Sequence, residues 1–260
     1  MRIISLGAGV QSSTMALMVK HGDLPPVDCA IFADTGGEPQ YVYDWLKKLD
    51  FILPYPIHRV TNGNLLESLM GSRSGRFASI PAFIDTKSGG MSRRQCTREY
   101  KISAIQKKVR ELMGLQPHER CQEPAQILIG ISMDEVVRMK PSGNGFMLNT
   151  FPLIDKNMTR QHCLHWLAGH GYRAPKKSAC TFCPYHDDVY WRDLKMNHPG
   201  DFANAVAVDE AIRSGSRMKM DNKVYLHRSL TPLKDVDFRN AQDMGQVDAF
   251  NNECEGMCGV

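Results

Sequence analysis

The segment Arg2-Ile-Ile-Ser-Leu-Gly-Ala-Gly-Val-Gln-Ser-Ser-Thr14 decides the fold that this sequence predicts. A short apolar run leads into small residues, and hydroxyl residues then open a helix. A strand that ends in such a loop before a helix directs backbone N–H groups at one point, which suits a phosphate group. We therefore expect a nucleotide-binding loop, formed by Ser5, Gly7, Ala8, Gly9, Gln11, Ser12 and Ser13.

Strand and helix patterns alternate after this loop. Apolar runs predict strands at 28–33, 57–60 and 126–131, and helical patterns cover 12–21, 40–49 and 101–113. This alternation is typical of a parallel sheet with helices packed on it. Because ligands bind at the carboxyl ends of such strands, the loop after residue 33 is expected at the same edge as the first loop.

The chain is expected to divide into two regions. Residues 1–155 form the nucleotide-binding α/β core, with a mobile loop at 71–95 that is rich in Gly, Ser and Arg. Residues 156–260 form a mainly helical, cysteine-bearing C-terminal region packed on the core, with helices at 159–170, 187–197 and 199–214. The length of 260 residues is sufficient for this organisation.

Bulk composition excludes few classes of partner. No apolar stretch is long enough for a membrane helix, so we expect a cytoplasmic protein without a membrane partner. The net charge of +4 permits a nucleic-acid partner without requiring one. Between residues 91 and 110, seven basic residues stand against one acid. This segment suits tRNA or DNA, or it is a solvated helix face.

The loop after the second strand contains Asp34, Thr35 and Gly36. An acid and a hydroxyl at this place could reach a ribose, a base or a magnesium ion. The same tripeptide is also a favourable turn, so its position beside the first loop is what supports a role in nucleotide binding.

The cysteines predict a metal or redox centre, because a disulfide framework is not expected in the cytosol. Cys180 and Cys183 form a C-x-x-C turn, and Cys96 lies among arginines as a third ligand or a reactive thiol. Spacing alone favours zinc on this pair with Cys254 and Cys258. The remaining cysteines, Cys29, Cys121 and Cys163, are expected to be structural. His186 is expected at the surface.

Several motifs, in order along nearly the whole chain, resemble the PP-loop ATP pyrophosphatases, and within them the phosphoadenosine phosphosulfate (PAPS) reductase branch of the adenine nucleotide alpha-hydrolase superfamily. Gly7-Ala-Gly-Val-Gln-Ser12 is similar to Ser-Gly-Gly-x-Asp-Ser, and Phe32-Ala-Asp-Thr-Gly36 is similar to F-x-D-T-G. The other similar segments are 94–101, 130–138, the C-x-x-C turn, and Glu253-Cys254. The resemblance implies a Rossmann-like (HUP-type) fold.

The resemblance also implies ligands and roles. It implies ATP or PAPS with magnesium, and a four-iron four-sulfur cluster on Cys96, Cys180, Cys183 and one more thiolate such as Cys254. Arg94 is expected to contact the nucleotide, and the catalytic residues implied are Lys101, Arg138 and Cys254. The chain departs from the family at Gln11, which replaces an aspartate, and at Gln95, which replaces a cysteine.

Three functions remain open at this stage. The favoured one is adenylation of a substrate with release of pyrophosphate, for sulfur transfer or modification of a nucleic-acid base, with a cysteine desulfurase as sulfur donor. The second is a PAPS or adenylylsulfate reductase in which Cys254 attacks the sulfur and thioredoxin resolves the product. The third is a non-catalytic module that binds a nucleotide or nucleic acid.

Overall fold

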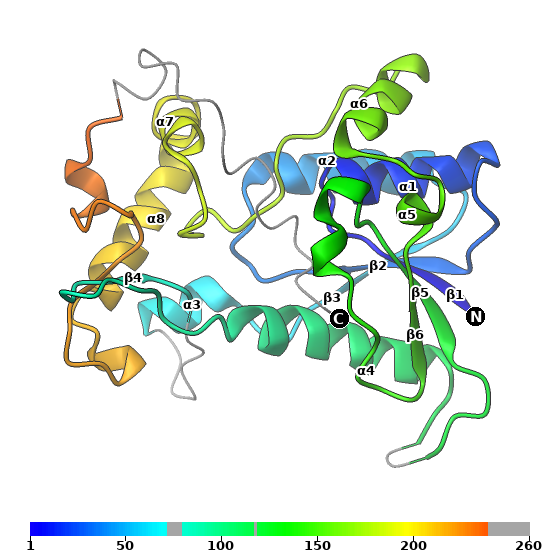
Figure 1. Cartoon of the computed structure of the whole chain (residues 1–260), viewed down its shortest axis with the longest axis horizontal. Helices are drawn as coiled ribbons and strands as arrows, with labels where there is room; N and C mark the ends of the chain where they lie inside the picture. The colour runs from blue at the N-terminus through cyan, green and yellow to red at the C-terminus, as the bar shows by residue number, and fades with distance from the viewer. Residues whose placement is uncertain (72–79, 117–118, 239–260) are drawn as a thin grey trace.

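The central sheet contains five parallel strands (Figure 1). A computed structural model describes residues 1–71, 80–116 and 119–238. The strands are β1 (Arg2–Ser5), β2 (Cys29–Ala33), β3 (Ile57–Val60), β5 (Ala125–Ile129) and β6 (Met147–Thr150), in the order β3-β2-β1-β5-β6. The strand order reverses direction between β1 and β5. Such a switch point opens a crevice at the carboxyl ends of the two strands, where α/β proteins bind ligands.

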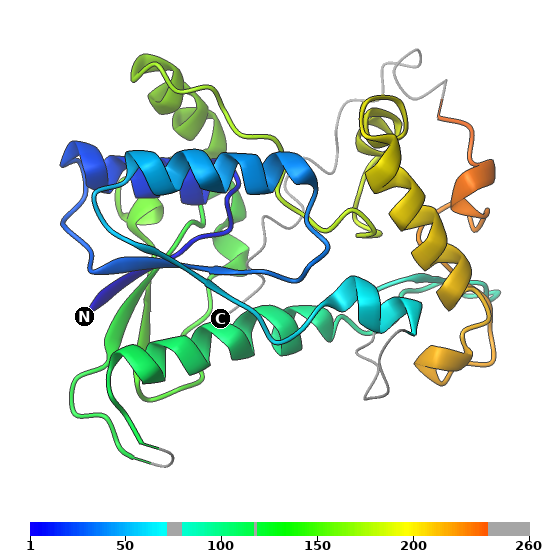
Figure 2. The same cartoon turned by 180° about the vertical axis from the view of Figure 1, so that it is seen from behind.

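Helices cover both faces of the sheet (Figure 2). On one face lie α1 (Val10–His21) and α2 (Gln40–Ile52), with α5 (Pro152–Asp155) and α6 (Arg160–Gly169) packed beside α1. On the other face lies α4 (Ser103–Leu112). Alternate residues of β1 enter these two cores, Ile4 toward α1 and Ile3 toward α4, as the two-residue period of a strand requires. The expected α/β fold with flanking helices is confirmed.

A second hydrophobic core lies beside the sheet, toward the left of Figure 1. Its elements are α3 (Leu65–Met70), the antiparallel pair β4 (Phe83–Ile84) and β7 (Val224–Tyr225), α7 (Asp188–Asn197), α8 (Pro199–Ile212), and the short turns η3 (Ser216–Met218) and η4 (Leu233–Asp235). Two further short helical turns are η1 (Thr97–Ile102), which is π-helical and runs into α4, and η2 (Met133–Arg138), which follows β5. None of the described helices is both long and apolar enough to cross a bilayer.

Packing crosses the expected boundary at residue 155. The second core joins Leu69, Ile80 and Tyr100 to Trp191 and other residues of the C-terminal half. The opposite also occurs, because Cys163 and Leu167 of α6 pack in the core formed by α1 and α2. The division at residue 155 therefore stays a prediction, because each of the two cores contains residues from both sides of this position.

Part of the segment 71–95, which was expected to be a mobile loop, contributes to a core. Residues 72–79 lie outside the described part, but β4 and the buried Ile80 and Ala82 follow directly. The expected loop thus includes a strand, because alternating apolar residues anchor it in the second core. Strand β6 was also missed in the sequence, because only one of its four residues is buried.

Asp209 anchors the second core from within α8. Its buried carboxylate accepts hydrogen bonds from the backbone N–H groups of Leu226 at 2.8 Å and Leu233 at 2.9 Å, and it pairs with Arg213. Two chain segments therefore depend on a single carboxylate.

Candidate functional site

The first loop joins β1 to α1 at the switch point. The Gly7 N–H donates to Ser12 Oγ at 3.2 Å, and Gly9 occupies the N-cap position of α1. Because the first turn of a helix has N–H groups without helical acceptors, this loop presents donors at the carboxyl edge of the sheet. Ser5 ends β1 and is fully buried, and Ser13 is buried with its hydroxyl accepting from Trp45 Nε1 at 2.9 Å. These two side chains face the protein interior.

Backbone geometry holds this loop in a tight turn. Ala8 has a φ of 61°, in the left-handed region that residues with a Cβ rarely occupy. Gly130, which follows β5, lies against the start of α1, and a Cβ at this position would stand 2.8 Å from Ser12 N and 2.9 Å from Ser12 Cα. The exit of β5 and the first turn of α1 therefore touch through backbone atoms.

A buried polar network connects α1 to η2 across the crevice. Gln11 Nε2 donates to Ser132 Oγ and to Glu135 Oε2, both at 3.3 Å. Glu135 pairs in turn with Arg138. Gln11 and Glu135 are 1% and 3% exposed, so the network is buried between α1 and η2.

The loop after β2 carries Asp34 beside the first loop. Asp34 Oδ1 accepts from the N–H of Gly36 at 2.8 Å and from the Tyr43 hydroxyl at 2.9 Å. Burial and the neighbouring Asp34 carboxylate raise the pKa of Tyr43, which therefore remains a proton donor. Gly36 adopts a φ of 70°, which favours glycine at this turn.

A pocket next to this loop gathers the predicted thiols. Cys96, Cys180 and Cys183 line it together with Arg94 and Lys101. Cys96 precedes η1, and the other two thiols come from the C-x-x-C turn, in which the Cys183 N–H donates to Cys180 O at 2.9 Å. The structure thus brings three predicted ligands and two predicted cations to one pocket.

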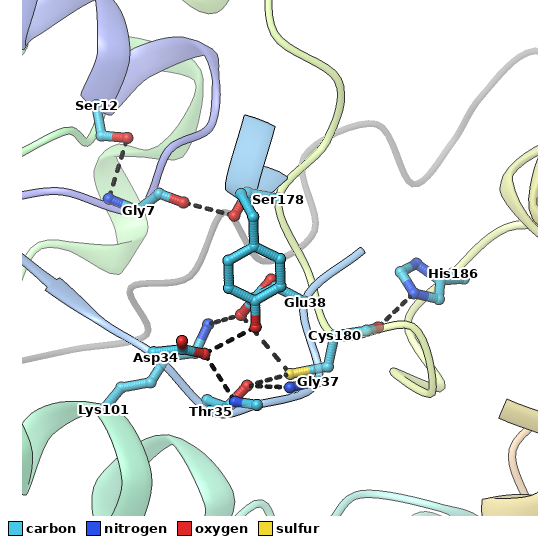
Figure 3. A network of polar contacts seen from close by, with 12 residues as sticks. Gly7, Ser12, Asp34, Thr35, Gly37, Glu38, Lys101, Ser178, Cys180 and His186 are labelled. Atoms are coloured by element: carbon cyan, nitrogen blue, oxygen red, sulfur yellow. Dashed lines mark hydrogen bonds and ion pairs between the residues drawn. The ribbon is translucent and has the colours of Figure 1, made fainter. Parts of the chain in front are cut away.

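Polar contacts tie the thiol pocket to both loops (Figure 3). Ser178 donates its hydroxyl proton to the backbone oxygen of Gly7, and two residues later Cys180 Sγ lies 3.2 Å from Thr35 Oγ1. Cys180 Sγ also lies 3.8 Å from Glu38 Oε1, which pairs with Lys101 Nζ at 3.0 Å. Burial, followed by the Glu38 carboxylate, raises the pKa of the Cys180 thiol well above its ordinary value. Among the described residues, Glu38 Oε2 has no hydrogen-bond partner.

The C-x-x-C turn is packed rigidly on the loop after β2. The Thr181 N–H donates to Gly37 O at 2.8 Å, and the Phe182 ring lies where a Cβ on Gly37 would approach it to 2.6 Å. Phe182 itself is 1% exposed. Residues between the two cysteines therefore serve as a packing contact.

The expected surface position of His186 is wrong. This residue is 7% exposed, because its ring stacks on Tyr190 with centroids 3.6 Å apart and meets Trp191 edge-on. Its Nε2 lies 2.8 Å from Cys180 O, an acceptor, so Nε2 carries the proton. Burial, followed by the charge of Lys177, lowers the pKa of His186 well below its ordinary value, and the ring is neutral. The expectations for Cys29 and Cys163 hold, since both are buried in the cores, and burial raises the pKa of Cys29 to about 11.

The residue types that line the thiol pocket suit a metal centre, whereas their arrangement suits it less well. Thiolates suit zinc and iron–sulfur clusters, and two adjacent cations would stabilise them. Within residues 1–71, 80–116 and 119–238, however, no three His, Cys, Asp or Glu side chains are arranged around one ion position. Cys254 and Cys258, named above as further ligands or nucleophile, lie outside the described residues.

The basic segment 91–110 divides into two parts. Arg94 faces the thiol pocket with its guanidinium over the Tyr185 ring, and Lys101 pairs with Glu38. Farther along α4, the basic side chains meet local partners: Lys107 contacts Asn62, Lys108 contacts Glu111, and Arg110 lies over the Phe146 ring. Arg138 belongs to the first-loop network, so the three predicted phosphate-binding cations lie in two groups.

Sequence reasoning missed Glu38, Tyr43, Ser178 and Glu135 as parts of the site. Glu38 follows a glycine pair at a strand end, and Ser178 immediately precedes the C-x-x-C segment, so proximity to recognised motifs was the available signal. Tyr43 had no such signal, because its role depends on the direction in which α2 leaves the loop.

Comparison with known proteins gives fold likeness only. No family model matches the chain, and no curated protein matches it. Among solved structures, it is similar to a PAPS reductase from Candida auris in a phosphate complex, with 12% identity and a TM-score of 0.46, over 67% of this chain and 74% of that chain. It is also similar to the U34-tRNA thiolase NcsA from Methanococcus maripaludis with its 4Fe-4S cluster, with 15% identity and a TM-score of 0.41, over 100% of this chain and 80% of that chain. Likeness of this degree carries no argument about function, which rests on this chain's own residues.

Proposed function

We propose that this protein is an adenine-nucleotide-dependent enzyme that adenylates its substrate with release of pyrophosphate and then transfers sulfur to the activated position, with AMP as the leaving group. The observation that carries this proposal is the junction between the two sites. Ser178 is bonded to the first loop at Gly7, and Cys180, two residues later, contacts Thr35. A nucleotide on the first loop would therefore lie beside the pocket that holds the thiols.

Different residues at the carboxyl edge of the sheet have different roles in the adenylation step. Backbone N–H groups from Ala8 to Gln11 and the Ser12 hydroxyl bind the phosphates. Asp34, oriented by Tyr43, positions the ribose or a magnesium ion. Arg138 stabilises the negative charge that develops at the transferred phosphorus, because a cation fixed beside the reacting group acts strongly where water is excluded.

The thiol pocket supplies the second step. Cys96, Cys180 and Cys183 would hold an iron–sulfur cluster together with one further thiolate, or take part in a zinc site, with Arg94 and Lys101 offsetting the negative charge of the thiolates. Such a centre, when bound, would offer a metal position for a sulfur ligand. A nucleic-acid base is the acceptor that we favour, bound through the segment 91–110, with the persulfide of a cysteine desulfurase as the sulfur donor and a thiol as the two-electron reductant.

A second candidate, a thiol-dependent PAPS or adenylylsulfate reductase, is favoured by one observation. Two cations and three thiols line the same pocket, which suits the sulfate group of such a substrate.

Product analysis separates these functions. Anaerobically purified protein, analysed for iron, zinc and labile sulfide, is incubated either with ATP, bulk tRNA, cysteine, a cysteine desulfurase and a thiol reductant or with PAPS and reduced thioredoxin. We expect pyrophosphate from ATP and no sulfite from PAPS. Cys180→Ser should retain pyrophosphate release and lose sulfur incorporation into tRNA, whereas Cys121→Ser, outside the pocket, should keep both.

Sulfite release from PAPS without pyrophosphate release from ATP would establish the reductase instead. ATP that binds and is never cleaved, with or without RNA or DNA, would indicate a non-catalytic module.

A further inference from the structure

A buried contact between a carboxamide and a carboxylate joins α1 to η2. Gln11 comes from the first turn of α1, after β1, and Glu135 comes from η2, after β5. The Gln11 amide donates to Glu135 Oε2 at 3.3 Å. Since the two residues are 1% and 3% exposed, this buried contact joins the two sides of the switch point.

The backbone of η2 is bent at the residue that makes this contact. Glu135 has φ −117° and ψ 16°, which are non-helical values within an otherwise helical turn. One carboxylate oxygen faces Gln11, and the other pairs with Arg138. A buried carboxylate is costly unless both oxygens have partners, and here α1 and Arg138 provide them.

We propose that Glu135 is the residue that positions Arg138 for the nucleotide phosphates, with Gln11 as its neutral anchor on the first loop. The inference rests on the proposed function and names the residue that sets the geometry of its cation. A guanidinium has five N–H donors, so Arg138 can keep the carboxylate and still bind a phosphate oxygen. About a fifth of its side chain, 20%, is exposed, which leaves an approach for a ligand.

The uncharged state of residue 11 is part of this arrangement. An acid at position 11 would place two carboxylates in one buried contact, where they repel each other. With glutamine, Glu135 is the only anion of the pair, and its charge is directed to Arg138. A side chain fixed before binding loses less conformational freedom when the ligand arrives, which raises affinity.

A double-mutant cycle tests the coupling. ATP affinity is measured by calorimetry for the wild type, Glu135→Gln, Arg138→Ala and the double variant, in magnesium-containing buffer. We expect about a tenfold loss for Glu135→Gln, the size expected when one hydrogen bond to a charged group is disturbed. Because Glu135 acts through Arg138, the double variant should bind no more weakly than Arg138→Ala alone.

Two further variants separate positioning from folding. Asp209→Asn changes another buried acid that pairs with an arginine, but in the second core, so it should lower the melting temperature and leave ATP affinity unchanged. The exchange of Gln11→Glu with Glu135→Gln keeps one acid and one amide in the contact. It should melt above Gln11→Glu alone and bind ATP as weakly as Glu135→Gln, since the carboxylate has moved away from Arg138. This variant replaces Glu135→Gln in the comparison if the single variant fails to fold.

The outcomes are distinct. A wild type that does not bind ATP refutes the proposed function before the cycle begins. Wild-type affinity in Glu135→Gln, losses that add in the double variant, or full affinity in the exchanged pair would overturn the role of Glu135 alone. If Asp209→Asn lost as much ATP affinity as Glu135→Gln, the loss would be explained by general destabilisation. That result would also overturn the role of Glu135.

Discussion

Substitution of Gly130 by alanine tests whether the first loop is held by backbone contact with the exit of β5. The new Cβ would stand 2.8 Å from Ser12 N, 2.9 Å from Ser12 Cα and 3.2 Å from Gln11 C. Ordinary contacts of a Cβ lie at 3.4–4 Å, so α1 or the strand exit has to move by roughly half an ångström or more. These neighbours are backbone atoms, and no side-chain rotation relieves them.

The magnitude follows from the rigidity of these neighbours. Overpacking of an interior site costs about 1–3 kcal/mol, and a backbone clash places Gly130→Ala near the upper end of this range. For a chain of this size, we expect the melting temperature to fall by roughly 5–10 °C. ATP affinity should fall further than stability alone explains, because the displaced atoms belong to the proposed phosphate-binding turn.

The assay is a thermal melt together with calorimetric titration of ATP. Gly143→Ala serves as the matched control, since a Cβ there has no neighbour within 4 Å. This control should leave both readings within error of the wild type. A melting temperature and ATP affinity of Gly130→Ala that equal those of the control would refute the proposed contact between β5 and α1.

Three further predictions concern the rest of the molecule. Gly37→Ala brings a Cβ to 2.6 Å from the Phe182 ring, so it should lower stability by about 1–3 kcal/mol and speed alkylation of Cys180 by iodoacetamide, as measured by mass spectrometry. Asp209→Ala removes a buried carboxylate with three partners and should cost about 3–5 kcal/mol in urea unfolding, whereas a cost below 1 kcal/mol would show that the carboxylate is not the anchor. Because the pKa of His186 is lowered in the folded protein, this side chain takes up a proton at a higher pH in the unfolded chain than in the folded one. As pH falls below 6.5, the free energy of unfolding therefore decreases by up to about 1.4 kcal/mol per pH unit, until the pH reaches the folded-state pKa. The urea midpoint should therefore fall less between pH 7.5 and pH 5.5 in His186→Gln than in the wild type. An equal fall in the two proteins would contradict this prediction.

The sheet was predictable because each of its central strands is a short apolar run bounded by turn residues. The predicted strand at 57–60 agrees with β3 at both ends, and Thr159 caps α6 as expected. The second core was not predictable in the same way. It is assembled from residues such as Leu69, Ile80 and Trp191, which are far apart in the sequence and show no shared period.

In the site too, residues with local sequence signals were predictable, and residues whose roles depend on distant partners were not. Loop residues such as Gly7 and Asp34 were recognisable because strand ends and glycine turns are local features. Glu38 and Glu135 were not recognisable, because their roles depend on partners more than 100 residues away in the sequence. Glu38 contacts Cys180, and Glu135 contacts Gln11. A charged residue in a loop is usually solvated, and nothing in its immediate sequence shows that it is buried.

The π-helical turn η1 explains how Cys96 and Lys101 line the same pocket. Cys96 precedes the turn, Lys101 lies five positions later, and both line the thiol pocket. In an α-helix, side chains five positions apart point about 140° away from each other. The wider turn, with i to i+5 hydrogen bonds, brings them toward the same side, and this geometry is frequent at functional sites. Because Lys101 is also paired with Glu38, the turn connects Cys96 to the loop that carries Asp34. The helix predicted at 101–113 did not include most of this turn, whose π-helical geometry brings Cys96 and Lys101 to one pocket.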